Sequence, residues 1–285
     1  MSTLVGTHPS GGNTRRFRKL GWTLLGLLLM VLFLFPFYMI LDSSLMAQTD
    51  VLRYPPPFFP PQLTLQGYSS AFAISGEYIR NSLVYGIGTI LVTMIVATPA
   101  AYSLARIRSR IGLFLLIALI LAQMAPGFVV ANSLYAIFSR LRLINSYAAV
   151  ILADSTGAVP FAIIIMRAFM LSIPRELSEA ALVDGAGHWT IFWSIVVPIS
   201  RTAIITAGLF AFLAGWGDFI FALTLTNSTH LTPITVGIYR FIGTYSTDWP
   251  SIMAMAMLAA VPAIILLVFA QRFIAAGITA GAVKE

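Results

Sequence analysis

The sequence has 285 residues, of which 59% are hydrophobic and only 9% are charged, whereas a soluble domain usually carries about a quarter charged residues. This composition excludes an ordinary soluble domain and predicts a protein whose solvent is a lipid bilayer. The absence of cysteine excludes disulfides, cysteine-based zinc sites and thiol catalysis. The net charge of +7 does not predict a nucleic-acid partner, because excess Lys and Arg in a membrane chain more often encodes orientation.

Six segments contain the roughly 20 mainly apolar residues that a membrane-spanning helix needs. They are 21–41, 82–105, 111–134, 147–171, 202–225 and 251–273. We predict an all-α, polytopic membrane protein with six transmembrane helices in residues 21–273, between an N-terminal tail at 1–20 and a C-terminal tail at 274–285. The first segment is too long for a signal-peptide core and no clean cleavage site follows it, so we expect a retained anchor. Prolines inside or near several spans predict bends, which suit either a gated pathway or ordinary packing: Pro36, Pro99, Pro126, Pro160 and Pro262.

The basic residues divide unequally between the two sides of the membrane. Six spans place both termini on one side, together with the loops around 106–110 and 167–201. That side carries twelve of the 17 basic residues and the other side carries five, namely Arg53, Arg80, Arg140, Arg142 and Arg240. The richer side should be cytoplasmic, so we expect a multi-pass protein of the cell membrane with both termini in the cytoplasm.

Three segments are expected on the outer side. Residues 42–79 include "YPPPFFPPQ", which cannot be helical. "IFSRLRLIN" predicts a short amphipathic helix at the membrane surface. Residues 226–250 are polar and contain His230, Asp248 and Trp249. None of these segments predicts a soluble domain.

A short polar helix is expected between the fourth and fifth spans, in residues 172–200. Ser172 could cap it, Pro174 would lie in its first turn, and Gly185 would end it. One face would carry Ile173, Leu177, Ala180 and Ala181, and the opposite face Arg175, Ser178 and Glu179, with Leu182 among them. The pattern alone fits a docking helix and a simple connection equally well.

This segment, "EAALVDGAGHWTIFWSIVVP", fits the signature E-A-A, three residues, G, nine residues, I-x-[LV]-P. It resembles the EAA loop of permease subunits of ATP-binding-cassette (ABC) importers. "AAYSLARIRSR", "GWGDFIFALTLT" and "AAGITAGAVKE" are similar to the carbohydrate-uptake (MalG-like) branch, and the resemblance runs from about residue 20 to the end. Two positions depart from the family pattern, because Thr202 replaces a usual proline and Gly217 a common asparagine.

The resemblance implies that the loop at 172–200 forms a cytoplasmic coupling helix that docks on an ATPase subunit. The implied docking residues are Glu179, Ala180, Ala181, Leu182, Asp184 and Gly185. The tail would contact the ATPase through Thr279, Gly281 and Lys284. The implied partners are a homologous second permease, two copies of the ATPase, an extracytoplasmic substrate-binding protein, membrane lipid and a sugar substrate.

The sequence contains no G-x-x-x-x-G-K-[ST] phosphate loop, no H-E-x-x-H and no G-x-S-x-G. We therefore expect a transport subunit rather than an enzyme. It should hold no metal or cofactor, and ATP and Mg should be bound by the partner ATPase.

Two acids lie inside expected spans, Asp154 and Asp218. A charged group there costs at least ~2.5 kcal/mol, so each should face the bundle interior or water. They could line a sugar pathway with Ser155, Thr156, Trp216 and Asn227, or form packing or gate contacts.

Two other classes stay open on the residues alone. An ion-driven secondary transporter would use broken helices from paired repeats, and an enzyme acting on lipid-linked sugars would need a catalytic acid or metal site. Copurification of an ATPase would separate the importer from both. The sequence does not distinguish among oligosaccharides, disaccharides, glycosylated metabolites and glycerol phosphates as the substrate.

Overall fold

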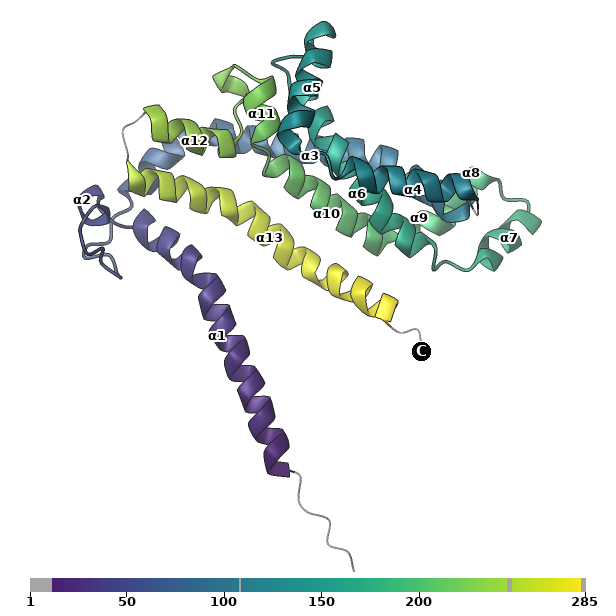
Figure 1. The fold of residues 1–285 in the computed structure, drawn as a ribbon, viewed down its shortest axis with the longest axis horizontal. Coiled ribbons are helices and arrows are strands. Elements are labelled where there is room, and N and C mark those ends of the chain that lie inside the picture. The colour runs from purple at the N-terminus through teal and green to yellow at the C-terminus, as the bar shows by residue number, and fades with distance from the viewer. Residues whose placement is uncertain (1–11, 108, 245–247, 283–285) are drawn as a thin grey trace, which may run out of the picture.

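The computed structural model describes residues 12–107, 109–244 and 248–282 (Figure 1). The described part of the chain is built from helices, without a strand. The long helices are α1 (Gly12–Ser44), α3 (Gln66–Arg106), α4 (Arg110–Ala122), α5 (Gly127–Arg140), α6 (Tyr147–Met170), α10 (Arg201–Trp216), α12 (Ile234–Thr244) and α13 (Trp249–Ala282). The short elements are α2 (Gln48–Val51), α7 (Arg175–Val183), α8 (His188–Ile191), the π-helix η1 (Phe192–Val196), α9 (Val197–Ile199), α11 (Ile220–Leu225) and the 3-10 turn η2 (Thr229–Leu231).

Four helices in the described chain, α1, α3, α6 and α13, are long and apolar enough to cross a bilayer. The number rises to six if two sharply bent helix pairs are each counted as one span. The all-α architecture and several apolar helices therefore agree with the expectation from the sequence. α3 is longer than the expected span 82–105. The helix has 41 residues, because it already begins at Gln66.

Two of the expected spans are not continuous helices. The segment 111–134 divides into α4 and α5, whose axes meet at 99°. Pro126 precedes α5 with an extended backbone, ψ 133°, and it has no N–H to continue the α4 hydrogen-bond pattern. The segment 202–225 divides into α10 and α11, because the backbone around Gly217 and Phe219 leaves the helical conformation. The bend predicted at Pro126 is confirmed, whereas the break near Gly217 was not predicted.

The expected surface helix over "IFSRLRLIN" is also wrong. α5 ends at Arg140, and the chain then turns through Arg142 and Asn145, which have φ angles of 56° and 62°. Asn145 supports the turn, because its Oδ1 accepts hydrogen bonds from the backbone N–H groups of Asn227 (3.2 Å) and Ser228 (3.1 Å). The proline-rich run, in contrast, is non-helical as expected.

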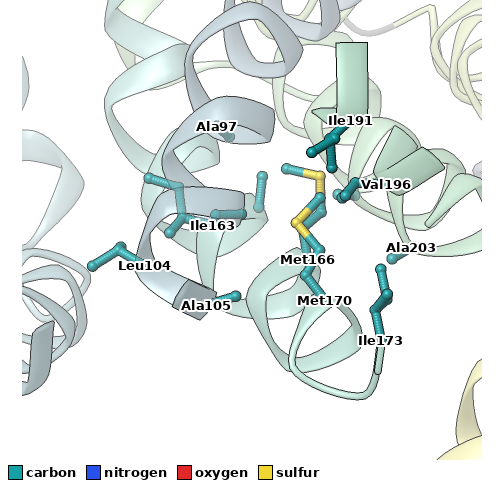
Figure 2. Close-up of a cluster of buried hydrophobic side chains, with 13 residues drawn as sticks. Ala97, Leu104, Ala105, Ile163, Met166, Met170, Ile173, Ile191, Val196 and Ala203 are labelled. Carbon is teal, nitrogen blue, oxygen red and sulfur yellow. The ribbon is translucent and has the colours of Figure 1, made fainter. Parts of the chain in front are cut away.

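The largest buried cluster lies where α3, α6 and the chain around α8 to α10 meet (Figure 2). Met166 and Met170 from α6 lie at its centre, next to Ile191 and Val196. Alanines at four-residue spacing, Ala97, Ala101 and Ala105, form the α3 side of the cluster. Small residues let two backbones approach closely, which is how helices associate strongly inside membranes.

Glycine permits a second close approach, between α10 and α3. A Cβ atom at Gly215 would lie 2.6 Å from Thr89 Oγ1 and 2.8 Å from the carbonyl oxygen of Tyr85. The backbone oxygen of Tyr85 cannot move aside, so only glycine fits at this contact. Together with the packing of α13 on α3 and α10, these contacts join α3, α6, α10 and α13 into one bundle.

α1 diverges from this bundle (Figure 1). It packs against α13, but the most apolar stretch of α1 has no buried residue. Its exposed apolar side chains include Trp22, Leu28 and Phe33. In a bilayer this surface must be covered by lipid or by another membrane-spanning chain.

Candidate functional site

α7 lies at one extremity of the molecule, beyond the ends of α4, α8 and α9 (Figure 1). Its first helical residue is Arg175, and Pro174 precedes it with an extended backbone. Ser172 does not cap the helix as the sequence suggested, because its hydroxyl donates to the carbonyl of Phe169 at 2.7 Å. The helix begins after Pro174 without a side-chain cap. Proline suits this position because it has no backbone N–H that would be left unpaired at the start of a helix.

Gly185 ends α7 with a left-handed residue, φ +85°. The Gly185 N–H donates to the carbonyl of Leu182 at 3.0 Å, and the Ala186 N–H donates to that of Ala181 at 2.9 Å. This pair of bonds is the Schellman motif, in which glycine avoids the steric penalty of a Cβ atom. The predicted helix end at Gly185 is confirmed.

The two faces of α7 differ from the expected division. Ala181 is half-buried against the central cluster, and Arg175 and Ser178 turn toward α3. The outward surface carries apolar residues at helical spacing and three acids: Leu177, Ala180, Val183, Glu176, Glu179 and Asp184. Val183 is 88% exposed, which is unusual for an apolar side chain on a short polar helix. We call these six residues the outer face of α7.

Arg106, the last residue of α3, faces the inner side of α7. Its Nη2 donates to Ser178 Oγ at 2.9 Å, and its guanidinium lies 5.5 Å from the ring centroid of Tyr102. Arg175 Nη2 donates to the carbonyl of Arg106 at 3.4 Å, a longer and weaker bond. A cavity of about 430 Å³ adjoins these groups and is also lined by Glu179 and His188. Sequence reasoning used Arg106 only for orientation and missed this contact.

Exposed aromatic rings lie beside α7. Trp189 and Trp193 are 70% and 52% exposed, and their ring centroids are 5.8 Å apart. Phe192 lies between them and Tyr102. Tryptophan is typical of the membrane–water interface, so these rings indicate the membrane level beyond which α7 projects. The chain then bends by 78° between the α8–α9 segment and α10.

Asp218 is a helix cap. Its Oδ1 accepts from the Phe221 N–H at 3.1 Å and its Oδ2 accepts from the Ala222 N–H at 2.7 Å. The hydroxyl of Thr235 donates to its carbonyl oxygen. The carboxylate thus satisfies backbone donors at the start of α11, which explains why the span breaks here.

Asp154 on α6 is buried, and its Oδ2 has no hydrogen-bond partner in the described structure. α6 packs against α10 and α11, the two helices that flank Asp218. Ser155 is buried and donates to the carbonyl of Ile151 at 2.7 Å. Thr156 is exposed. An unpaired buried carboxylate is costly, and therefore Asp154 needs an explanation beyond packing.

The remaining candidates lie in other parts of the chain. Trp216 is buried at the contact of α10 and α13, where its Nε1 donates to the carbonyl of Ala259 at 3.1 Å. It also stacks on Phe212, which gives it a packing role in this structure. Asn227 is exposed in the segment before η2. The backbones of Thr279 and Gly281 belong to α13, whereas the side chain of Thr279 and all of Lys284 lie outside what the structure describes.

Several relatives match the chain over most of its length. A probable ABC transporter permease protein y4oR of Sinorhizobium fredii is 34% identical and covers 96% of this chain and 99% of its own. The sulfoquinovosyl glycerol transport system permease protein SmoH of Agrobacterium fabrum is 31% identical, with 90% and 91% covered. The trehalose/maltose transport system permease protein MalG of Thermococcus litoralis is 28% identical, with 90% and 94% covered.

A solved structure shares the fold. A crystal structure of a bacterial ABC transporter involved in import of the acidic polysaccharide alginate contains a chain with a TM-score of 0.78 at 20% identity. The match covers 93% of this chain and 99% of that chain. The family model for the inner membrane component of binding-protein-dependent transport systems matches residues 90–280. The chain belongs to the family of inner membrane components of binding-protein-dependent transport systems.

Proposed function

We propose that this chain is the membrane-spanning permease subunit of an ATP-driven, binding-protein-dependent importer of a disaccharide, an oligosaccharide or a related glycoside. Relatives with 28–31% identity are permease proteins of the sulfoquinovosyl glycerol and trehalose/maltose systems, which supports a glycoside as the substrate class. The chain itself contains no phosphate-binding loop, so ATP and Mg would be bound by a separate ATPase subunit present in two copies. This chain would hold no cofactor and would catalyse no reaction.

The observation that carries the proposal is the outer face of α7. It combines Glu179 and Ala180 of the E-A-A motif, exposed apolar residues and three acids on a helix that projects from one end of the bundle. Within the described structure Glu179 forms no ion pair, so its carboxylate is available to a basic group of a partner. Ala180 presents only a methyl group, which allows a second backbone to come close. We assign the ATPase-docking role to Glu179, Ala180, Ala181, Leu182, Asp184 and Gly185.

The other partners follow from the exposed surfaces. The apolar surface of α1 fits a homologous second permease, with lipid covering what that partner leaves. The binding protein would contact residues 42–79 and 226–250 on the side opposite to α7, and the C-terminal residues Thr279, Gly281 and Lys284 would contact the ATPase. Both termini would be cytoplasmic, since α7 is placed in the cytoplasm by the distribution of basic residues.

In this mechanism ATP binding brings the two ATPases together, and α7 transmits that displacement to the bundle as a rigid body. The sharp bends beside α8–α9 and between α4 and α5 mark places where helices can reorient. The pathway would then open outward, receive the sugar and reset after hydrolysis. Asp154, whose Oδ2 has no partner in the described structure, is the best supported pathway residue. Ser155, Thr156, Trp216, Asp218 and Asn227 are the other candidates for the pathway.

The test is purification of the tagged chain from its native membrane, followed by reconstitution with its ATPase and binding protein. We expect an ATPase to copurify and sugar uptake to require ATP. Glu179→Lys should leave the amount of membrane-inserted protein unchanged and abolish coupled uptake. Uptake that persists without an ATPase and stops with an ionophore would replace this proposal with a secondary transporter.

A further inference from the structure

The inner end of α3 is bonded directly to α7. Arg106 Nη2 donates to Ser178 Oγ at 2.9 Å, and the Arg106 carbonyl accepts from Arg175 at 3.4 Å. Among the described residues, every hydrogen bond that a side chain makes between α7 and another helix involves Arg106. A bond donated by a guanidinium is stronger than a neutral one. A displacement of α7 should therefore carry the end of α3 with it.

α3 is one uninterrupted helix from Gln66 to Arg106. Its 41 residues correspond to a length of about 60 Å at 1.5 Å per residue. Pro99 removes one internal bond, but Ala97, Ala101 and Leu104 on either side of it belong to the central cluster of Figure 2. The packing on α6 therefore supports α3 on both sides of the proline, and the helix stays continuous there.

Buried side chains near the middle of α3, 21 to 25 residues before Arg106, hold the segment 230–234 around η2. Asn81 Nδ2 donates to the carbonyls of His230 (2.9 Å) and Thr232 (3.0 Å). Tyr85 OH donates to the carbonyl of Leu231 at 2.7 Å. Ser82 Oγ in turn accepts from the backbone N–H of the first residue of α12, at 3.0 Å.

These bonds attach the backbone of the segment to α3, whereas its tip stays exposed. Asn81 and Ser82 are fully buried, and Tyr147 OH donates to Asn81 Oδ1 at 2.6 Å, which fixes the amide. Thr229 and His230 are exposed, and His230 Nδ1 lies 2.9 Å from Glu77 Oε1, also on α3. Four α3 side chains thus determine where this segment lies.

We propose that α3 transmits the position of the coupling helix α7 to the segment 228–234, whose residues Thr229 and His230 are exposed, and that Arg106 is the positioning residue for this transmission. The inference rests on the proposed function, in which α7 contacts the ATPase and residues 226–250 contact the binding protein. It adds a specific path, which runs from Arg106 at the inner end of α3 along the continuous helix to Asn81, Ser82 and Tyr85 near its middle. Because linkage is reciprocal, the binding protein would also act on the ATPase through the same helix.

The experiment uses the complete reconstituted complex with Thr229→Cys, since the chain has no native cysteine. The rate of labelling by a membrane-impermeant maleimide is measured without nucleotide and after trapping with ATP and vanadate. We expect the two rates to differ about fivefold or more, the size of a typical coupling between sites. Arg106→Gln and Ser178→Ala should each reduce the difference to less than about twofold. Their combination should add nothing, because both remove the same bond.

Arg110→Gln is the matched control, because Arg110 is an exposed arginine at the start of α4, four residues further along the chain. It should keep the full difference. Stimulation of the ATPase by the binding protein should fall in Asn81→Ala and in Arg106→Gln. This measurement tests the same path in the opposite direction, from the binding protein to the ATPase.

Ser178→Ala also controls for misfolding. It removes only a hydroxyl from a half-exposed position, so the variant should fold normally. If both Ser178→Ala and Arg106→Gln keep the full nucleotide-dependent difference, the inference is wrong while the proposed function stands. If the complex with Thr229→Cys alone has no ATPase bound, or does not respond to nucleotide in labelling or in uptake, the proposed function fails together with the inference.

Discussion

Replacing Asp218 with alanine should destabilise the folded chain much more than replacing Asp154 with asparagine. The Asp218 carboxylate accepts two backbone bonds, from Phe221 at 3.1 Å and from Ala222 at 2.7 Å. Loss of an N-cap costs about 1 kcal/mol, and a buried N–H left without a partner costs about 1–3 kcal/mol. We expect the free energy of unfolding to fall by about 2–4 kcal/mol in Asp218→Ala.

Asp154→Asn should not lower the free energy of unfolding. Asp154 Oδ2 is buried without a partner, so asparagine keeps the shape and removes a buried charge. The free energy of unfolding should stay the same or rise. Reversible unfolding of the purified protein in mixed micelles, followed by the fluorescence of its five tryptophans, measures both variants. A loss in Asp154→Asn equal to that in Asp218→Ala would refute the different roles we assign to the two acids. If Asp154 lines the pathway, the stable asparagine variant should nevertheless transport more slowly.

Two glycines give further tests. Gly215→Val should lower the yield of folded protein sharply, because a Cβ atom would lie 2.8 Å from the carbonyl oxygen of Tyr85. Gly208→Ala should be tolerated, since its nearest neighbour would be 3.9 Å away, and size-exclusion profiles compare the two. Gly185→Asp strains a residue with φ +85° by about 1–3 kcal/mol, so it should reduce uptake at normal membrane levels. Gly187→Asp, where φ is −73°, should reduce uptake less, and equal effects would show that the turn conformation is unimportant.

The sequence was sufficient for the fold class and for the end of the coupling helix. Hydropathy alone predicts apolar helices, and Gly185 predicts the turn because few other residues adopt a positive φ. Hydropathy could not reveal the breaks within two spans, because an interruption of four residues (123–126) or three residues (217–219) barely changes the mean hydropathy over about 20 residues. The signals were nevertheless present: Pro126 cannot continue a helix, and Asp218 after Gly217 has the composition of a helix cap.

The contacts of α3 could not be predicted from local patterns. Asn81 bonds to residues about 150 positions away, and Arg106 bonds to Ser178 across 72 positions. A polar residue such as Asn81 next to an apolar span indicates a functional or packing role, but not its partner. The orientation of α7 could not be predicted either. Periodicity defines two faces of the helix, but the contacts of Arg106 with Ser178 and Arg175 are needed to know which face lies against the bundle.

Crosslinking from α7 tests the central claim most directly. Val183→Cys, at a position 88% exposed on the outer face of α7, would carry the only cysteine of the chain and a photoactivatable maleimide in native membranes. The account predicts a crosslink to an ATPase subunit from this position, and none from Leu63→Cys, which is 77% exposed in the outer segment 42–79. Labelling of Val183→Cys by an impermeant reagent from outside intact cells, with no ATPase crosslinked, would contradict it.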